Sequence, residues 1–497
     1  MSGSTSIVAF SEIPTDWRVP GTFVEVRPSY SNIGVLPWPA RALLIGQMRA
    51  APNAGTATAL QVYPITRADQ AIGLFGAGSQ LARMAALFLA ANRSTPLFAM
   101  GVADPAGGAA ATGSFAISGS QTAAGTIAAY IGGERVTAPV TLTDTPTTIA
   151  TKLRDAINAR TDLPVTATAA TGTVTVTAKH AGTIGNAIDL RLNRRPDEAT
   201  PRGLTVAVTA MASGAGVVDI TAALSAVASD WYTDIVPGWT DTSNLAVLEA
   251  ELVRRYAASG RLDAHAYVAL SGSYGTLAGL GAARNSQHVT ALGMAGMVTE
   301  PWAVAASLAG VCAFQLTNDP ARQLRGLALP GVAAPAPASR FIESERDLLL
   351  RDGISTFLVQ SDGTVILERV ITMYQKTSLG VDDTAWLDIM VPKTLSRLRY
   401  DWRTWITLQY PRHKLADDGA LAAEYSDVVV TPRILHSSWG ARCTEYERNG
   451  WIEGATETVA QSSFVRDGTD RNRVNSRQVV RIIGNLMVLA VALEFEV

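Results

Sequence analysis

Two hydrophobic patterns alternate in residues 41–102 and again in residues 231–270. The first pattern is a short continuous apolar run, typical of a strand buried on both faces, and it occurs at 41–47, 96–102, 231–237 and 264–270. Between them, apolar residues recur at helical spacing, at 81–91 and at 245–259. Buried strands that alternate with helices predict an α/β sheet covered by layers of helices.

A different pattern interrupts this core. Residues 106–200 are dominated by Thr, Ala and Gly, with Phe115 and Tyr130 as the aromatic residues. Polar and apolar residues alternate at 173–177 and again at 205–208, as in half-buried strands. One helix is expected over 147–159, because Pro146 suits a helix start and apolar residues then follow at helical spacing. We therefore predict a compact β-rich module inserted into the core and dispensable for its assembly.

Further along the chain, a Ser-Asp-Gly-Thr turn at 361–364 predicts a hairpin. The residues after it are richer in aromatic and charged side chains, and we expect a helix over 392–408. The fold class expected is mixed α/β, with a C-terminal α+β domain. The predicted divisions are an N-terminal arm 1–22, core 23–105, inserted module 106–204, core 205–368, C-terminal domain 369–484 and C-terminal strand arm 485–497.

Both ends of the chain carry apolar residues with no evident domain to bury them. Residues 6–10 are largely apolar, and 486–497 form a strand pattern in which Leu493, Phe495 and Val497 share one face. An unpaired strand this apolar is an aggregation hazard. Either the ends fold back on their own domain, or they reach into neighbouring copies of the chain.

Composition narrows the classes of function. Hydrophobic residues make up 47% and charged residues 17% of the 497 residues, with a formal net charge of −2. This composition excludes disorder as the dominant state. It also excludes the basic footprint that nucleic acids or anionic membranes require. Weak self-repulsion suits a subunit that packs against copies of itself.

Membrane insertion and secretion are not expected either. The longest apolar stretch, 291–316, is interrupted by Glu300-Pro301, and the first residues lack the pattern of a signal peptide. Cys312 and Cys443 cannot build a disulfide framework, so reduced core thiols are expected.

Motifs for catalysis are weak. Gly76-Ala77-Gly78-Ser79 precedes a helix but lacks the lysine of a phosphate-binding loop. Ser273 lies in a glycine-rich turn with His265 as a conceivable partner, but a nucleophile elbow would need glycine at position 271. The histidines are scattered, and the acid pairs 382–383 and 417–418 adjoin turn residues. We expect no catalytic residue, cofactor or metal site.

Several segments in order along the chain resemble the tail sheath proteins of contractile phage tails, most closely the Mu-like branch. They are Ile13-Pro14 with Arg18-Val19-Pro20-Gly21, Gly73–Leu81, Glu368–Tyr374, Asp383 with Trp386–Asp388, Leu398–Tyr400 with Arg403, and Tyr410–Gly419. The family's middle domain is often described as subtilisin-like. No Asp/His/Ser triad can be placed here, so the label is taken to describe fold alone.

The resemblance implies a structural subunit that polymerises as a helical sleeve of hexameric discs around a tail tube and contracts to drive the tube through the host envelope. Implied partners are other copies, the tail tube protein, and baseplate and tail terminator proteins, without nucleic acid or membrane insertion. The implied location is the virion tail, assembled in the host cytoplasm. Terminal arms would complete a small sheet in the C-terminal domain of a neighbour. The threonine-rich composition of the inserted module suits an exposed decoration, so we expect the module on the outer surface.

Two groups of residues are candidates for these contacts. The strand-exchange candidates are Ile7, Val8, Phe10, Leu489, Val491, Leu493 and Phe495. The tube-facing candidates, taken from the arginine-rich C-terminal domain, are Arg397, Arg399, Arg403, Arg412 and Lys414.

Two other classes of protein stay open on the sequence alone. One is an α/β hydrolase with a β-sandwich appendage, which would carry a serine or cysteine that reacts with active-site probes. The other is a virion adhesin or decoration protein, suggested by the threonine-rich module, which would form no long polymers.

Overall fold

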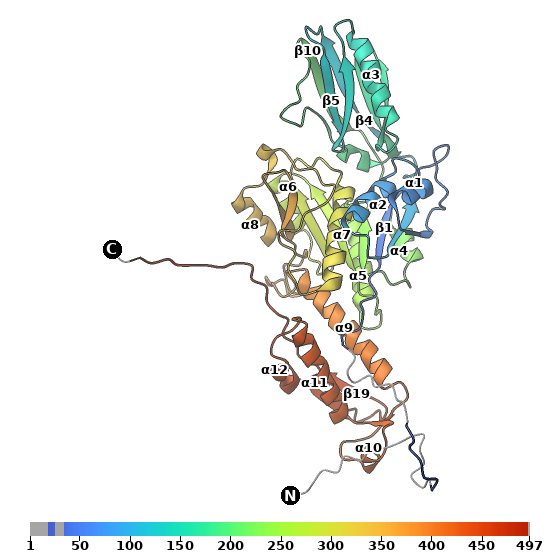
Figure 1. The fold of residues 1–497 in the computed structure, drawn as a ribbon, viewed down its shortest axis with the longest axis vertical. Helices are drawn as coiled ribbons and strands as arrows, with labels where there is room; N and C mark the ends of the chain where they lie inside the picture. The colour runs from blue at the N-terminus through green and yellow to red at the C-terminus, as the bar shows by residue number, and fades with distance from the viewer. Residues whose placement is uncertain (1–17, 25–33, 496–497) are drawn as a thin grey trace. The chain divides into compact units, whose positions relative to one another are not determined.

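The computed structural model describes residues 18–24 and 34–495 (Figure 1). These residues divide into two compact units. The core unit contains Trp38–Arg397 and the segment from Ile482 onward. The C-terminal unit contains Leu398–Arg481 together with the described residues before Trp38.

The core unit is built on a sheet with eight strands among the described residues, in the order β15-β14-β13-β12-β11-β1-β3-β2. The strands are β1 (Ala42–Gln47), β2 (Val62–Ile65), β3 (Leu97–Val102), β11 (Asp234–Pro237), β12 (His265–Ser271), β13 (Val289–Met294), β14 (Ile354–Val359) and β15 (Val365–Arg369). The strands from β14 to β3 are parallel, and the edge strands β15 and β2 pair antiparallel to their neighbours. The predicted layered α/β core is confirmed.

Helices cover both faces of this sheet. In β1, Ala42 and Leu44 pack into one hydrophobic core and Leu43 and Ile45 into the other, as the two-residue period of a strand requires. The first core is covered by α1 (Ala68–Phe75), α2 (Gln80–Ala91) and α7 (Pro301–Asn318). The second is covered by α4 (Thr221–Ala226), α5 (Thr242–Tyr256), α6 (Tyr274–Ala282) and α8 (Glu343–Arg351).

Helix α7 explains the long apolar stretch in the sequence. It is buried over most of its length, and Gly310 lets it approach α2, since a Cβ there would lie 2.8 Å from Cβ of Ala91. Within the described chain, no helix is long and apolar enough to cross a bilayer. The stretch is a core helix, and Pro301 starts it.

The inserted module is a layered β structure with one long helix in its described part. Its sheets have the orders β10-β4-β8-β7 and β6-β5-β9. The elements are β4 (Ala110–Gly119), β5 (Gly125–Ile131), β6 (Glu134–Val140), α3 (Pro146–Ala159), β7 (Val165–Ala170), β8 (Thr173–Ala181), η1 (Thr183–Ala187), β9 (Leu190–Leu192) and β10 (Leu204–Ala212). Thr145 caps α3 through the backbone N–H of Thr148, and Pro146 opens the helix as predicted.

One boundary of the module differs from the prediction. Strand β10 pairs antiparallel with β4, so the module extends to Ala212 and not to residue 204. The alternation at 205–208 predicts the strand itself. Its partner β4 lies about 90 residues earlier in the chain, so the local pattern does not identify it.

The C-terminal unit is mainly helical. Its elements are the second part of α9 (Met390–Gln409), β16 (Lys414–Leu415), α10 (Leu421–Glu424), β17 (Val429–Val430), α11 (Pro432–Arg448), α12 (Ala455–Gln461), β18 (Ser463–Arg466) and β19 (Val474–Arg477). Aromatic side chains hold its interior together: Trp402 stacks on Trp405 at 5.8 Å and meets Trp439 edge-on at 5.1 Å.

The division near α9 also differs from the prediction of a C-terminal domain that begins at 369. Residues 369–397 group with the core unit. Val370, Ile371 and Met373 are buried, and the Met373 N–H donates to the carbonyl of Val289 beside β13. The hairpin strand β15 is therefore followed by a segment that continues to pack on the sheet.

A fully buried carboxylate organises the C-terminal unit. Asp401 on α9 accepts hydrogen bonds from Arg442 (Nη2, 2.6 Å), from Tyr446 (Oη, 2.7 Å) and from the backbone N–H of Leu36 (2.8 Å). The Asp401 and Arg442 side chains are 0% and 2% exposed. These contacts join α9, α11 and the segment before Trp38.

We expect Asp401→Ala to destabilise the C-terminal unit by about 3–5 kcal/mol, because the buried guanidinium of Arg442 would lose its partner. The matched control is Glu424→Ala, an exposed acid on α10, which should change stability by no more than about 0.5 kcal/mol. Urea unfolding followed by tryptophan fluorescence measures both. A loss below about 1 kcal/mol for Asp401→Ala would contradict this role.

Candidate functional site

The hydrolase candidates do not form a catalytic pair. His265 opens β12 and bonds Thr290 at 2.8 Å, whereas Ser273 follows the other end of that strand and caps α6. The strand has seven residues, so its two ends are six steps apart, or about 20 Å at 3.3 Å per residue. Burial lowers the pKa of His265 well below its ordinary value. Both residues have structural partners, and the geometry gives no support to acyl-transfer chemistry.

The glycine-rich loop before α2 is a closed turn. Ser79 caps α2 by accepting from the Ala82 N–H, and a Cβ at Gly78 would lie 2.5 Å from Nζ of Lys179. Lys179 itself donates to the carbonyl of Thr161 at 2.7 Å. Burial, and then the charge of Arg49, lower the pKa of Lys179 to about 8. The Lys179 side chain of the inserted module therefore occupies the space beside Gly78 in this loop.

Three of the four carboxylates in the acid pairs have local contacts. Asp383 accepts from Tyr374 Oη at 2.6 Å, which holds the pKa of Asp383 below its usual range. Asp417 pairs with Arg466 at 2.9 Å, and Asp418 accepts from the N–H of Arg433. These carboxylates fix turns and helix starts.

Metal ligation has no candidate in residues 18–24 and 34–495, where no group of three or more His, Cys, Asp or Glu side chains converges. The two cysteines are free and buried. Burial raises the pKa of both thiols, that of Cys443 to about 12.

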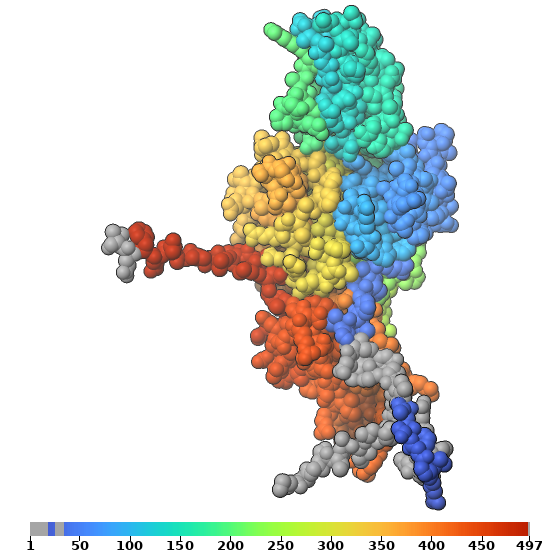
Figure 2. All heavy atoms as spheres, viewed as in Figure 1, coloured from blue at the N-terminus to red at the C-terminus, as the bar shows by residue number. Residues whose placement is uncertain are grey.

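The last described residues form an exposed apolar segment. Asn485 Oδ1 accepts from the Gln323 N–H at 3.1 Å, and the Leu486 and Met487 carbonyls accept from Gln323 and Arg325. Beyond these contacts the described part of the segment has no helix or strand, and Figure 2 shows it as a single extended stretch of chain. The exposed fractions of its strand-exchange candidates are Leu489 75%, Val491 73%, Leu493 90% and Phe495 82%. Ile7, Val8 and Phe10 lie outside the described residues.

A short hairpin in the C-terminal unit is a possible acceptor for added strands. Strands β18 and β19 pair antiparallel over four residues each, from Ser463↔Arg477 to Arg466↔Val474. Within the described chain no further strand joins them. An isolated two-stranded hairpin is only marginally stable in water, and Val465 is 61% exposed on it.

The five tube-facing candidates occupy different environments. Arg397 is 8% exposed, and its guanidinium lies 5.9 Å from the ring centre of Trp38 within the core unit. That burial indicates a packing role for Arg397. Arg399 and Arg403 are half-buried on α9, and Arg412 and Lys414 are exposed.

Polar contacts attach the inserted module firmly to the core, a feature that the sequence did not indicate. Arg83 on α2 donates to Glu134 of the module (2.9 Å), to the carbonyl of Gly132 (3.1 Å) and to Glu300 (3.3 Å) at the start of α7. Glu300 is fully buried. The two parts touch in Figure 2, and one hydrophobic cluster runs through both.

A second polar set reinforces this attachment. His180 of β8 bonds Asp104 at 2.7 Å through Nδ1, and its Nε2 accepts from the backbone N–H of Gln80 at 3.1 Å. Gln47 of β1 donates to Asp104 and to the carbonyl of Ala181. No sequence motif signals these residues, because they come together only from distant strands and turns.

Helix α9 is anchored to the sheet by a buried ion pair. Lys393 Nζ lies 2.5 Å from Asp234 Oδ1, and the same carboxylate accepts from Tyr267 Oη at 2.9 Å. The two charged side chains are 10% and 2% exposed. The first turns of α9 are thereby fixed to β11 and β12, and the helix continues into the C-terminal unit.

Comparison with known proteins places these features in a family. Residues 213–373 match the model of the phage tail sheath protein central domain, and residues 381–496 match that of the phage tail sheath C-terminal domain. The first match begins directly after β10 ends. The chain is 34% identical over 489 residues to the tail sheath protein of the Mu-like prophage FluMu of Haemophilus influenzae, covering 98% of this chain and 99% of that protein.

A solved structure agrees at the level of fold. The sheath tail protein of Listeria innocua superimposes with a TM-score of 0.50 at 12% sequence identity, covering 91% of this chain and 94% of that one.

We expect Arg83→Ala to destabilise the core unit by about 3–5 kcal/mol at pH 7, since it leaves the buried carboxylate of Glu300 without its ion-pair partner. Burial raises the pKa of Glu300, while Arg83 acts to lower it. With the pKa raised further in the variant, the native state binds the proton more readily than the unfolded state, so stability falls as pH rises. The deficit should therefore be smaller at pH 5 than at pH 7.

Urea unfolding at both pH values tests this expectation, with the exposed Arg93→Ala as the control. A deficit that does not change with pH, or that equals that of the control, would show that the Arg83–Glu300 ion pair does not stabilise the core unit.

Proposed function

This chain belongs to the phage tail sheath protein family, and from that premise we propose that its copies polymerise as a helical sleeve of hexameric discs around a tail tube. The sleeve would contract and drive the tube through the host envelope. As a sheath protein the chain is a component of the virion tail. The tail tube protein, the baseplate and the tail terminator are its proposed partners, and the host cytoplasm is its proposed place of assembly.

The exposure of the C-terminal segment is the observation that carries this proposal. Leu493 and Phe495 are 90% and 82% exposed, although burial of each would contribute about 1.5–3 kcal/mol. An alternating apolar segment gains both this burial and backbone hydrogen bonds when it adds to a sheet edge. We propose that residues 486–497 and the N-terminal arm, with Ile7, Val8 and Phe10, add to the β18–β19 hairpin of neighbouring copies.

Contacts of this kind suit a helical polymer. A head-to-tail contact that does not close into a ring propagates as a helix. The low charge of the chain limits repulsion between copies. The energy of contraction would be stored in the extended lattice and released as subunits gain contacts, without a nucleotide.

The C-terminal unit is the proposed inner layer of the sleeve, and the inserted module the proposed outer one. Among the tube-facing candidates, Arg412 and Lys414 are exposed and Arg399 and Arg403 partly so. Exposed charge pairs are worth only about 0–1 kcal/mol each. Such contacts would hold the tube and still release it when the sleeve contracts.

Deletion of residues 486–497 should leave a folded, soluble protein that no longer forms tubes, and deletion of residues 1–18 should act in the same direction. A finer test exploits the alternation of the segment. Leu493→Asp with Phe495→Asp should abolish polymerisation, whereas Glu494→Gln on the opposite face should preserve it. Sedimentation and negative-stain microscopy measure polymer, and circular dichroism monitors the fold. Normal tubes from either deletion would refute strand exchange.

Sheath–tube attachment should weaken as salt is raised from about 0.05 to 0.5 M, because exposed charge pairs are screened. The sleeve itself should persist, since backbone hydrogen bonds and apolar burial hold its subunits together. Arg412→Gln with Lys414→Gln should lower the salt concentration at which the tube is released. A sleeve that dissociates before the tube is freed would place the electrostatic contact between subunits instead.

A further inference from the structure

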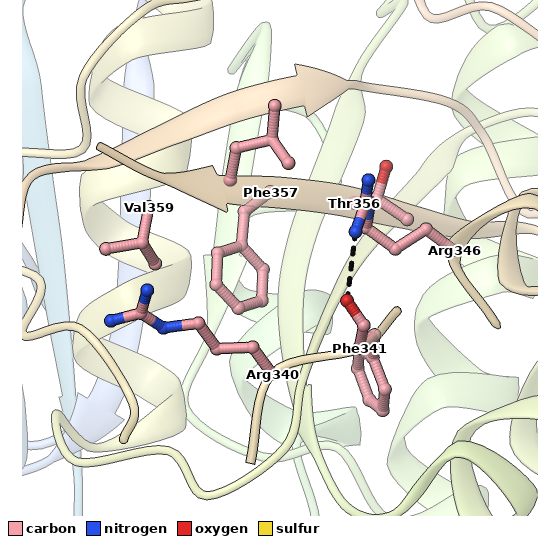
Figure 3. A pocket seen from close by; sticks show the side chains of 7 residues that line it. Arg340, Phe341, Arg346, Thr356, Phe357 and Val359 are labelled. Atoms are coloured by element: carbon pink, nitrogen blue, oxygen red, sulfur yellow. Dashed lines mark hydrogen bonds between the residues drawn. The ribbon is translucent and has the colours of Figure 1, made fainter. Parts of the chain in front are cut away.

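A pocket of about 140 Å³ lies beside β14 in the core unit (Figure 3). A cavity of this order, about 150 Å³, accepts a group the size of benzene. Its lining consists of Arg340, Phe341, Arg346, Thr356, Phe357, Leu358 and Val359. The pocket therefore combines two guanidinium groups with two aromatic rings. The guanidinium groups suit a carboxylate, and the rings suit an apolar side chain next to that carboxylate.

Unused hydrogen-bonding capacity marks this pocket. Arg346 is occupied by Glu368 (2.8 Å) and by the carbonyl of Phe341 (2.9 Å). Arg340 donates through Nε to the carbonyl of Pro335 at 3.2 Å, and no carboxylate of the described residues lies within ion-pair distance of it. Its remaining guanidinium donors are available.

The hydroxyl of Thr356 is the second sign. Thr356 is 2% exposed, lines the pocket, and its Oγ1 has no hydrogen-bond partner in the described chain. Leaving a buried polar group unpaired costs about 1–3 kcal/mol. A ligand atom seated in the pocket would remove that cost.

A rigid turn elsewhere in the core unit presents a matching surface. In the segment Lys376–Asp382 the ends form a β-bridge, and the Thr377 N–H donates to the carbonyl of Val381 at 2.8 Å. Leu379 and Val381 are 88% and 62% exposed at its tip, and Asp382 is exposed beside them. The tip is apolar with an adjacent carboxylate.

The base of this turn is firmly held. Gln375 Nε2 donates to the carbonyls of Gly281 (2.9 Å) and Arg284 (3.1 Å), and Asn285 Oδ1 accepts from the N–H groups of Gln375 and Lys376. The turn therefore holds Leu379 and Val381 in water, where a partner that covers them gains the free energy of their burial.

The turn and the pocket lie at opposite ends of the same strand. Gln375 also approaches the carbonyl of Asp352, just before β14 begins at Ile354, whereas the pocket reaches Val359 at the end of β14. Two complementary surfaces that lie apart on one unit can make a head-to-tail contact, which repeats from copy to copy.

We propose that the Lys376–Asp382 turn of one copy docks in the Arg340 pocket of a second copy. The Asp382 carboxylate pairs with Arg340, and Leu379 or Val381 packs against Phe341 and Phe357. The proposal rests on the proposed polymerisation and adds to the strand exchange a contact between core units.

A charge exchange tests the pairing. Asp382→Arg and Arg340→Glu should each raise the critical concentration for tube formation at least tenfold, because each places like charges together. The double variant should recover most of the wild-type value. Asp197→Arg, which reverses an exposed acid in the inserted module, is the control and should assemble normally. Circular dichroism and monomer melting temperatures show whether each variant is folded.

The outcomes separate this inference from the proposed function. Wild-type protein that forms no tubes would overturn both. Wild-type tubes together with normal tubes from Asp382→Arg or Arg340→Glu would overturn the docking contact alone, as would a double variant no better than the singles.

Cross-linking gives an independent readout. In assembled tubes, Leu379→Cys with Val359→Cys should form a disulfide ladder of many copies on a non-reducing gel, and each single variant should not. Absence of the ladder from assembled tubes would overturn the contact. A product that stops at the dimer would indicate a symmetric contact and would equally overturn it.

Discussion

The parallel strands at the centre of the core unit must be covered by other elements on both faces. This requirement determines which surfaces of the core unit can contact partners. Strand β1 sends Leu44 into one core and Leu43 into the other, so helices occupy both sides of the sheet. Partners must therefore meet the outer helix faces, the strand ends, the insertions or the chain termini. The Arg340 pocket, the Lys376–Asp382 turn, the inserted module and the C-terminal segment occupy those positions.

Buried ion pairs mark the places where separate parts of the chain are joined. Arg83 pairs with Glu300 of the core and with Glu134 of the module, Lys393 and Asp234 join α9 to the sheet, and Arg442 and Asp401 join helices of the C-terminal unit. Burying a charge costs desolvation energy, so such pairs add little net stability compared with apolar packing. Their directional hydrogen bonds do fix geometry.

The surfaces proposed for assembly have a different character. Leu493 and Phe495 are exposed in the single chain, and the β18–β19 hairpin pairs only four residues in each strand. In the proposed strand addition, the side chains would be buried and the backbone paired in one step. The ion pairs that join the parts of the chain lie within one copy, whereas the proposed assembly surfaces would be completed by neighbours.

The sequence by itself determined the elements whose signals are local. Apolar runs located β1, β3 and β12, Pro146 located the start of α3, and motifs spread along the chain indicated the family. Only the tertiary structure decided what depends on distant partners. It paired β10 with β4, moved residues 369–397 to the core unit, buried Arg397 and joined Arg83 to Glu300. The physical reason is that periodicity reports which face of an element is apolar, whereas the partner of a strand edge or a buried charge is set by the packing of segments far apart in the chain.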